Sequence, residues 1–153
     1  MKLEVWEAAS SIIEAGGTFQ HGTYACRKSN GKFHRKDGPA VVYLDGRFFW
    51  YLNGKLHRAD GPAVTFSDGE QHWYRNGKLH RDDGPAVAHP NGRQYWYRND
   101  QLHREGGPAI IHPDGEQHWY LNNKRHRDDG PAIICPDGRW LWYRNGKPHV
   151  ALP

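Results

Sequence analysis

The stretch HRDDGPAVAHPNGRQYWYRNDQL, at residues 80–102, decides the fold because it joins two turn signals to short runs of β-prone residues. The Pro-Asn-Gly sequence at 90–92 suits a three-residue hairpin loop, a type I turn followed by glycine in the left-handed conformation. The Asn-Asp pair at 99–100 stands where related segments of the chain have Asn-Gly, a strong signal for a two-residue type I′ turn. Val, Tyr and Trp between the turns favour strands. The stretch therefore predicts two successive β-hairpins.

The same pattern recurs along the chain with a constant period of 23 residues. The histidines that open the five units are His34, His57, His80, His103 and His126. One further step reaches His149, where the pattern stops. Fixed internal periodicity indicates a repeat architecture, in which stacked neighbours bury a continuous core. We therefore expect an N-terminal cap at 1–29, five repeats at 30–149 and a C-terminal tail at 150–153.

The expected fold class is all-β, an antiparallel sheet of tandem hairpins with a short helical cap at its N-terminus. The helix is predicted from residues that fit one helical face before the stop signal Gly16-Gly17, namely Val5, Trp6, Ala9, Ile12 and Ile13. This helix is expected to cover the first edge of the sheet, because open edges invite unwanted pairing. Residues 18–29 are expected to supply one degenerate hairpin.

The two turns also fix which residues face each other across each hairpin. In the unit that starts at His80, the first loop pairs Val87 with Tyr95, and the second turn pairs Tyr97 with Leu102. One face is expected to be the packed side because its residues are mostly apolar: Pro85, Val87, Tyr95, Tyr97 and Leu102. The opposite face is expected to be mixed, with small alanines that make room for an indole: Ala86, Ala88, Gln94, Trp96, Arg98, Gln101 and His103.

Two short motifs occur in every unit, with substitutions in the third and fourth: Trp-Tyr-x-Asn-Gly-Lys, as at 73–78, and Asp-Gly-Pro-Ala, as at 83–86. Together with the unit length and the Gly-centred hairpins, these motifs resemble the MORN repeat family in its variant form. The resemblance covers about residues 30–149 and implies an elongated, twisted single antiparallel sheet. Arrays of this variant type are similar to those of phage, large-virus and bacterial proteins.

A His, an Arg and an Asp within four residues raise the question of catalysis. A catalytic site needs a unique arrangement of unlike groups, whereas five translated copies create equivalent environments. The segment also resembles a kinase catalytic loop, but the other kinase signatures are not recognisable. We therefore predict that the protein is not an enzyme, and that the aspartate caps a turn while the arginine packs or pairs nearby. These aspartates are Asp37, Asp60, Asp83 and Asp129, with Gly106 at the equivalent position of the fourth unit.

The opening histidines are predicted to bind no metal. Each repeat adds about two strands, so successive histidines stand ~10 Å apart, whereas zinc needs its ligand atoms ~2 Å away. We expect each of these histidines to stack on a tryptophan and to hydrogen-bond a neighbouring turn. No cofactor is expected. The less regular histidines at other positions of the repeat receive no metal role: His72, His89, His112 and His118.

A binding surface is predicted on the mixed face, because a single sheet cannot bury both of its faces well. A partly exposed row of indoles with basic edges is typical of such surfaces, and packing within the sheet is the alternative role for these indoles. The candidate binding residues are the tryptophan column (Trp50, Trp73, Trp96, Trp119 and Trp142), the histidines His57, His80, His103 and His126, and the arginines Arg58, Arg75, Arg81, Arg98, Arg104, Arg127 and Arg144.

A protein partner is the first expectation, because an extended repeat sheet is a generic docking scaffold. The alternative is a nucleotide or nucleic acid, since arginine contacts phosphate and aromatic rings stack on bases. That alternative would suit a phage-type counter-defence protein that sequesters a signalling nucleotide. Two features weigh against a basic groove: the net charge is +4, and one column alternates in sign, Arg47, Glu70, Arg93, Glu116 and Arg139.

Composition sets the remaining expectations. Cys26 and Cys135 lack CxxC spacing, so neither a zinc site nor a disulfide framework is indicated. The N-terminal stretch does not suggest a secretion signal, and no apolar run suits a membrane span, so a cytoplasmic location is expected, in the host if the protein is viral. The ends of the array are more apolar than its middle, which favours packing against the caps or a homodimer formed through these ends.

Overall fold

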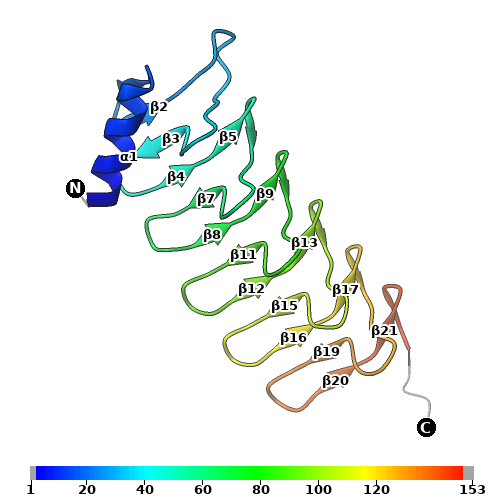
Figure 1. The fold of residues 1–153 in the computed structure, drawn as a ribbon. Coiled ribbons are helices and arrows are strands. Elements are labelled where there is room, and N and C mark those ends of the chain that lie inside the picture. The colour runs from blue at the N-terminus through cyan, green and yellow to red at the C-terminus, as the bar shows by residue number, and fades with distance from the viewer. Residues whose placement is uncertain (1–2, 150–153) are drawn as a thin grey trace. The chain divides into compact units, whose positions relative to one another are not determined.

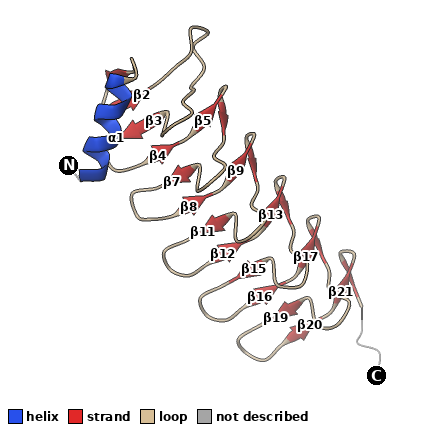
Figure 2. Ribbon diagram, viewed as in Figure 1, coloured by secondary structure: helices blue, strands red, loops and turns tan. Residues whose placement is uncertain are grey.

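The computed structural model describes residues 3–149, so the predicted tail at 150–153 lies outside the described residues. The chain divides into two compact units, residues 1–78 and 79–153. Each unit consists of short antiparallel strands joined by turns, and unit 1 begins with the helix drawn in blue in Figure 2. Between residues 15 and 149 the structure contains strands, turns and loops but no helix, as expected for the repeats.

Unit 1 is an open antiparallel sheet with a helix at its start (Figure 1). Its sheet strands follow the order β1-β2-β3-β4-β7-β8. Strands β5 and β6 form a separate hairpin. The elements are α1 (Leu3–Glu14), β1 (Thr18–Gln20), β2 (Thr23–Ala25), β3 (Val41–Tyr43), β4 (Phe48–Phe49), β5 (Tyr51–Leu52), β6 (Lys55–Leu56), β7 (Val64–Thr65), β8 (Gln71–His72) and β9 (Tyr74–Arg75), with β10 (Lys78–Leu79) at the boundary of the units.

Unit 2 repeats the same design without a helix. Its open sheet has the order β11-β12-β15-β16-β19-β20. The pairs β13/β14, β17/β18 and β21/β22 are separate hairpins, on the side opposite to the wider loops in Figure 1. The elements are β11 (Val87–Ala88), β12 (Gln94–Tyr95), β13 (Tyr97–Arg98), β14 (Gln101–Leu102), β15 (Ile110–Ile111), β16 (Gln117–His118), β17 (Tyr120–Leu121), β18 (Lys124–Arg125), β19 (Ile133–Ile134), β20 (Trp140–Leu141), β21 (Tyr143–Arg144) and β22 (Lys147–Pro148).

The predicted register is confirmed. Val87 pairs with Tyr95, and Tyr97 pairs with Leu102. The turn chemistry explains this, because Asn99 and Asp100 have φ of 51° and 67°, the left-handed values that a type I′ turn requires. The all-β architecture of tandem antiparallel hairpins with one N-terminal helix is therefore also confirmed.

The predicted division into a packed face and a mixed face is wrong in part. The deepest residues of the repeats come from the mixed face, since the alanine column has 0% exposure at each position: Ala40, Ala63, Ala86, Ala109 and Ala132. On the expected packed face Val87 is buried, but Tyr95 and Tyr97 are half-buried. The reason is that side chains alternate between faces only along a continuous strand. Strands β12 and β13 are two residues long, and Trp96 between them belongs to neither.

The predicted helix is present, but its packed face differs from the prediction. Val5, Ala9 and Ile12 are buried, while Trp6 and Ile13 are 56% and 47% exposed. One residue along an α-helix is a rotation of about 100°, so Trp6 and Ile13 turn away from the buried stripe. Val5 and Ile12 pack with Cys26 and Val42 in one core cluster, so the helix covers inner strands of the sheet as well as its edge.

Two further features tie the cap to the sheet. A Cβ added to Gly17 would lie within 3 Å of Ile12 and of the Ala25 carbonyl, so the chain can leave the helix this tightly only through glycine. The Arg35 side chain donates to Ser11 Oγ at 3.2 Å, which links the first repeat to α1. Strands β1 and β2 form a hairpin in the segment where the degenerate hairpin is expected. In residues 3–149 no helix has the length and apolar character needed to cross a membrane.

Candidate functional site

The arginines of three HRxDG segments, Arg58, Arg104 and Arg127, each lie over a tryptophan ring. We use that name for residues 34–38, 57–61, 80–84, 103–107 and 126–130. In unit 2 the Arg104 guanidinium carbon is 4.0 Å from the Trp96 ring centroid, and its NH1 donates to the Pro108 carbonyl at 3.0 Å. A Cβ added to Gly107 would lie 2.9 Å from the same guanidinium carbon. The guanidinium is therefore held between an indole and a glycine backbone.

The same arrangement recurs in the second and fifth repeats. Arg58 lies 4.3 Å from the Trp50 centroid in unit 1, and Arg127 lies 4.3 Å from the Trp119 centroid in unit 2. In each of these repeats the arginine Nε also donates to the aspartate two residues later, Asp60 at 3.0 Å and Asp129 at 2.9 Å. This hydrogen bond lowers the pKa of each aspartate below its usual value. The predicted pairing of arginine with aspartate in a turn is therefore confirmed here.

The fourth repeat departs from this pattern because Gly106 replaces the aspartate. Arg104 keeps its tryptophan contact, and burial lowers the pKa of its guanidinium. The neighbouring Glu105 instead lies 3.4 Å from both Arg98 and His103. The stack on tryptophan is thus independent of the aspartate.

Each opening histidine is hydrogen-bonded to the asparagine turn near the end of its own repeat. The Nδ1 atom of His103 accepts a hydrogen bond from the backbone N–H of Asn122 at 3.3 Å, and His126 accepts from Asn145 at 3.2 Å. The same Nδ1 atoms also lie 2.8 Å (His103) and 3.1 Å (His126) from the side-chain oxygens of these asparagines. Nε2 of His126 lies 3.1 Å from Asp128, in position to donate to that carboxylate. The predicted hydrogen bond to a neighbouring turn is confirmed.

The prediction that an opening histidine stacks on each tryptophan is wrong for three of the tryptophans. The charged group over the rings of Trp50, Trp96 and Trp119 is an arginine guanidinium, not a histidine ring. The backbone explains the exchange, because the His103 N–H donates to the Trp96 carbonyl and Nδ1 points onward to the next turn. The following residue, Arg104, is then the one placed over the indole.

The histidine, arginine and aspartate of the third HRxDG segment do not converge on one site. In the third repeat His80 Nε2 lies 2.9 Å from Asp82, whereas Arg81 donates to Asp83 at 3.0 Å. Each charged group thus has a partner inside its own turn. The arrangement suits a rigid loop that presents an indole edge and a charged rim.

The exposed arginines of the predicted surface border these loops. Arg98 lies against Glu105, and Arg144 pairs with Asp128 at 3.1 Å. Arg75 is also exposed, and all five tryptophans of the column are half-buried. Guanidiniums and carboxylates therefore alternate around the indoles.

Between successive HRxDG segments the surface is hollowed beside a tryptophan. One hollow in unit 1, of about 810 Å³, is lined by residues that include Pro39, Trp50 and Leu52. A hollow in unit 2, of about 370 Å³, has Pro108, Trp119 and Leu121 at the equivalent positions. A third, of about 350 Å³, lies beside Trp96. These hollows are the concave features that the tryptophan column provides.

Replacing Gly107 by alanine is expected to lower the free energy of unfolding by about 1–2 kcal/mol, because the new methyl group displaces the guanidinium from the indole. Urea denaturation followed by tryptophan fluorescence measures this change. The control is the same substitution in an Arg104→Ala background, where the clash is gone and the loss should largely disappear. An equal loss in both backgrounds would contradict the stacked arrangement.

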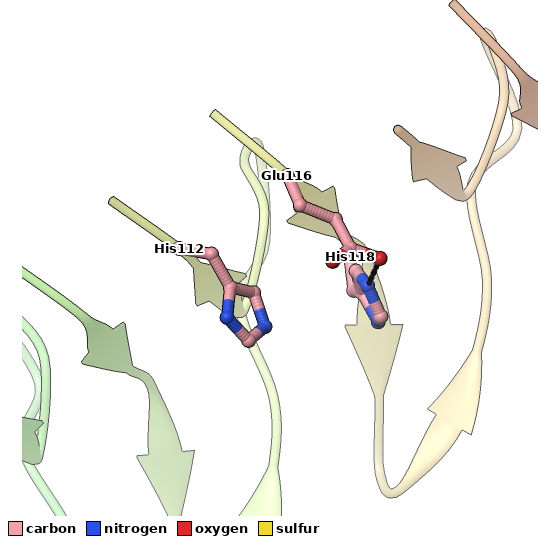
Figure 3. A group of neighbouring side chains, drawn as sticks. All are labelled: His112, Glu116 and His118. Carbon is pink, nitrogen blue, oxygen red and sulfur yellow. Dashed lines mark hydrogen bonds and ion pairs between the residues drawn. The ribbon is translucent and has the colours of Figure 1, made fainter. Parts of the chain in front are cut away.

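The structure also gathers three side chains that the sequence analysis leaves without a role. Figure 3 shows His112, Glu116 and His118, whose ligand atoms all lie within 4.8 Å of one another. They were not predicted as a site because His112 and His118 lie outside the regular histidine column. The usable signal was the spacing His-x3-Glu-x-His around the Pro-Asp-Gly loop at 113–115, since a three-residue hairpin loop pairs residue 112 with residue 116.

Comparison with known proteins adds no assignment to this geometry. No protein-family model matches the chain, and no curated protein matches it.

Proposed function

We propose that this protein is a non-enzymatic scaffold that binds a protein partner in the hollows beside its tryptophan column. The observation that carries the proposal is the lining of these hollows, which combines an indole with charges of both signs and, beside Trp50 and Trp119, an aliphatic side chain. Such a lining suits a polypeptide, whose side chains offer apolar groups, cations and carboxylates together.

The apolar part of each hollow supplies the anchor. Trp119, Leu121 and Pro108 meet in one hollow of unit 2, and Trp50, Leu52 and Pro39 meet in one of unit 1. The residues of each set are half-buried or buried and are held by backbone pairing. Binding a partner would therefore cost these side chains little conformational entropy. An aliphatic or aromatic side chain of the partner fits such a seat, and tryptophan is a frequent energetic hot spot.

The hollows differ at one position of the repeat, which gives the surface its selectivity. This position holds Leu52, Arg75, Arg98, Leu121 and Arg144 in successive repeats. The leucine hollows take an apolar group, whereas the hollow beside Trp96 has Arg98, which lies against Glu105, on its rim and takes a polar side chain. The order of apolar and polar residues in the partner then determines whether it binds.

The charges argue against the alternative of a nucleotide. Arg58 and Arg127 are already paired with Asp60 and Asp129. Carboxylates also line each hollow, including Asp37 in unit 1 and Asp128 in unit 2. A phosphate would face these carboxylates and would have to displace the existing pairs. The variant MORN resemblance supports the same conclusion of a repeat scaffold, and its viral associations would place the partner in a host cell.

The test compares what three purified proteins capture from a bacterial lysate at high salt. We expect wild type and Leu44→Asp to retain the same protein, and the double variant Leu52→Asp/Leu121→Asp to lose it by about tenfold or more. Leu44 is the control because it is exposed but lies outside the hollows. Equal capture by all three would contradict the proposal. A sample that instead releases a 260-nm-absorbing compound on heating would establish the nucleotide alternative.

A further inference from the structure

We propose that His112, Glu116 and His118 form a binding site for one divalent transition-metal ion of the zinc class. The site is separate from the tryptophan hollows and stands independently of the proposed partner. It belongs to the fourth repeat, at the loop that joins β15 to β16 (Figure 3).

The distances already approach those of a metal site. Glu116 Oε1 is 2.8 Å from His118 Nε2, and the two imidazole centroids are 5.7 Å apart. Metal–ligand distances of about 2.0–2.2 Å place ligand atoms of one tetrahedron roughly 3.3 Å from each other. Side-chain torsions alone therefore suffice to bring all three atoms onto one ion, which replaces the hydrogen bond between Glu116 and His118.

The hairpin holds the three residues on one face. The His112 N–H donates to the Glu116 carbonyl at 2.9 Å, and the Gly115 N–H donates to the His112 carbonyl at 3.1 Å. Asp114 Oδ1 accepts from the Glu116 backbone N–H at 3.0 Å, which fixes the start of the returning strand. His118 pairs with Ile110 across the hairpin. It lies two positions after Glu116, and residues two apart in an extended chain share a face.

The donor set selects the class of ion. Two neutral imidazoles and a carboxylate suit zinc and similar first-row ions, whereas calcium and magnesium prefer oxygen ligands alone. His118 and Glu116 are largely sheltered, with side-chain exposures of 14% and 31%. Three protein ligands leave one position of a tetrahedron to water. The nearby Arg139 is paired with Asp137 at 2.7 Å, which offsets its repulsion of a cation.

The sister repeats serve as internal controls, because each lacks at least one of the three ligands. The second repeat has Phe66, Glu70 and His72 at these positions, and Phe66 contacts the His72 ring edge-on at 5.2 Å between centroids. The third repeat has His89, Arg93 and Tyr95, and the fifth has Cys135, Arg139 and Leu141. Within residues 3–149 this trio is accordingly the single group of three such ligands.

The experiment titrates the untagged full chain with ZnCl2 by isothermal calorimetry in a non-chelating buffer. Wild type is expected to bind one zinc ion. His112→Phe and His118→Tyr are each expected to weaken binding by about tenfold or more. Both borrow the residue of a sister repeat, so the hairpin should fold, which circular dichroism checks. The matched control His72→Tyr should bind as wild type does.

Two further variants sharpen the assignment. Phe66→His completes the trio in the second repeat, so the stoichiometry should rise from one zinc ion per chain to two. Cys135→Ser should leave zinc affinity unchanged, because the thiol is not one of the three ligands. The proposal is overturned if wild type binds no zinc, if His72→Tyr and His118→Tyr lose equal affinity, if Phe66→His stays at one ion, or if Cys135→Ser binds tenfold more weakly.

Discussion

Ala86→Ile is expected to lower the free energy of unfolding by about 3 kcal/mol, whereas Ala88→Ile, two residues later, is expected to change it by less than about 0.5 kcal/mol. Ala86 has 0% exposure, and every repeat has alanine at its position. An isoleucine there has no space, so strands and side chains must shift to admit it.

The control uses the same substitution two residues away. Ala88 is half-buried, and its sister residues are Val42, Thr65, Ile111 and Ile134. The repeat therefore accommodates a β-branched side chain at this position. Equilibrium urea unfolding of both variants decides the point. Equal losses would show that the alanine column is not the tightest part of the repeat.

Trp96→Ala is expected to lower the free energy of unfolding by about 2–3 kcal/mol. The estimate takes roughly half the usual cost for a core tryptophan, because Trp96 is half-buried, and adds about 0.5–1 kcal/mol for the lost guanidinium contact. The indole is also the base on which Arg104 rests, so its removal leaves that cation partly buried beside a void.

Trp140→Ala provides the comparison for this substitution. Trp140 is 56% exposed in β20, and three of its sister residues are glutamines, Gln71, Gln94 and Gln117. We expect a change within about 0.5 kcal/mol. A loss at Trp140 as large as that at Trp96 would mean that aromatic area alone, rather than the stacked loop, sets the stability.

The hairpins could be predicted from sequence because their turns act locally. Loops at 90–92 and 99–100 fix the pairing of Val87 with Tyr95 and of Tyr97 with Leu102 through backbone conformation alone. Once two turns fix a register, the period repeats it. The buried faces were not predictable in this way, because strands of two residues do not extend face alternation past Trp96.

The candidate site was predictable by residue type but not by role. The sequence gathers tryptophan, histidine and arginine in each repeat, and the structure places them together. The sequence alone does not show that Arg104 covers Trp96, because that contact depends on the space that Gly107 leaves for the guanidinium. The proximity of His112, Glu116 and His118 could have been predicted from the hairpin register, because the three residues flank one loop of known type.

We infer that the HRxDG segments are repeated structural loops that hold tryptophans in place, and not one specialised site. Double-mutant cycles on the free energy of unfolding test it directly, using alanine substitutions in the pairs Trp50/Arg58, Trp96/Arg104 and Trp119/Arg127. We predict three similar coupling energies of about 0.5–2 kcal/mol. Coupling near zero in all three pairs, or a large value in one pair alone, would contradict the account.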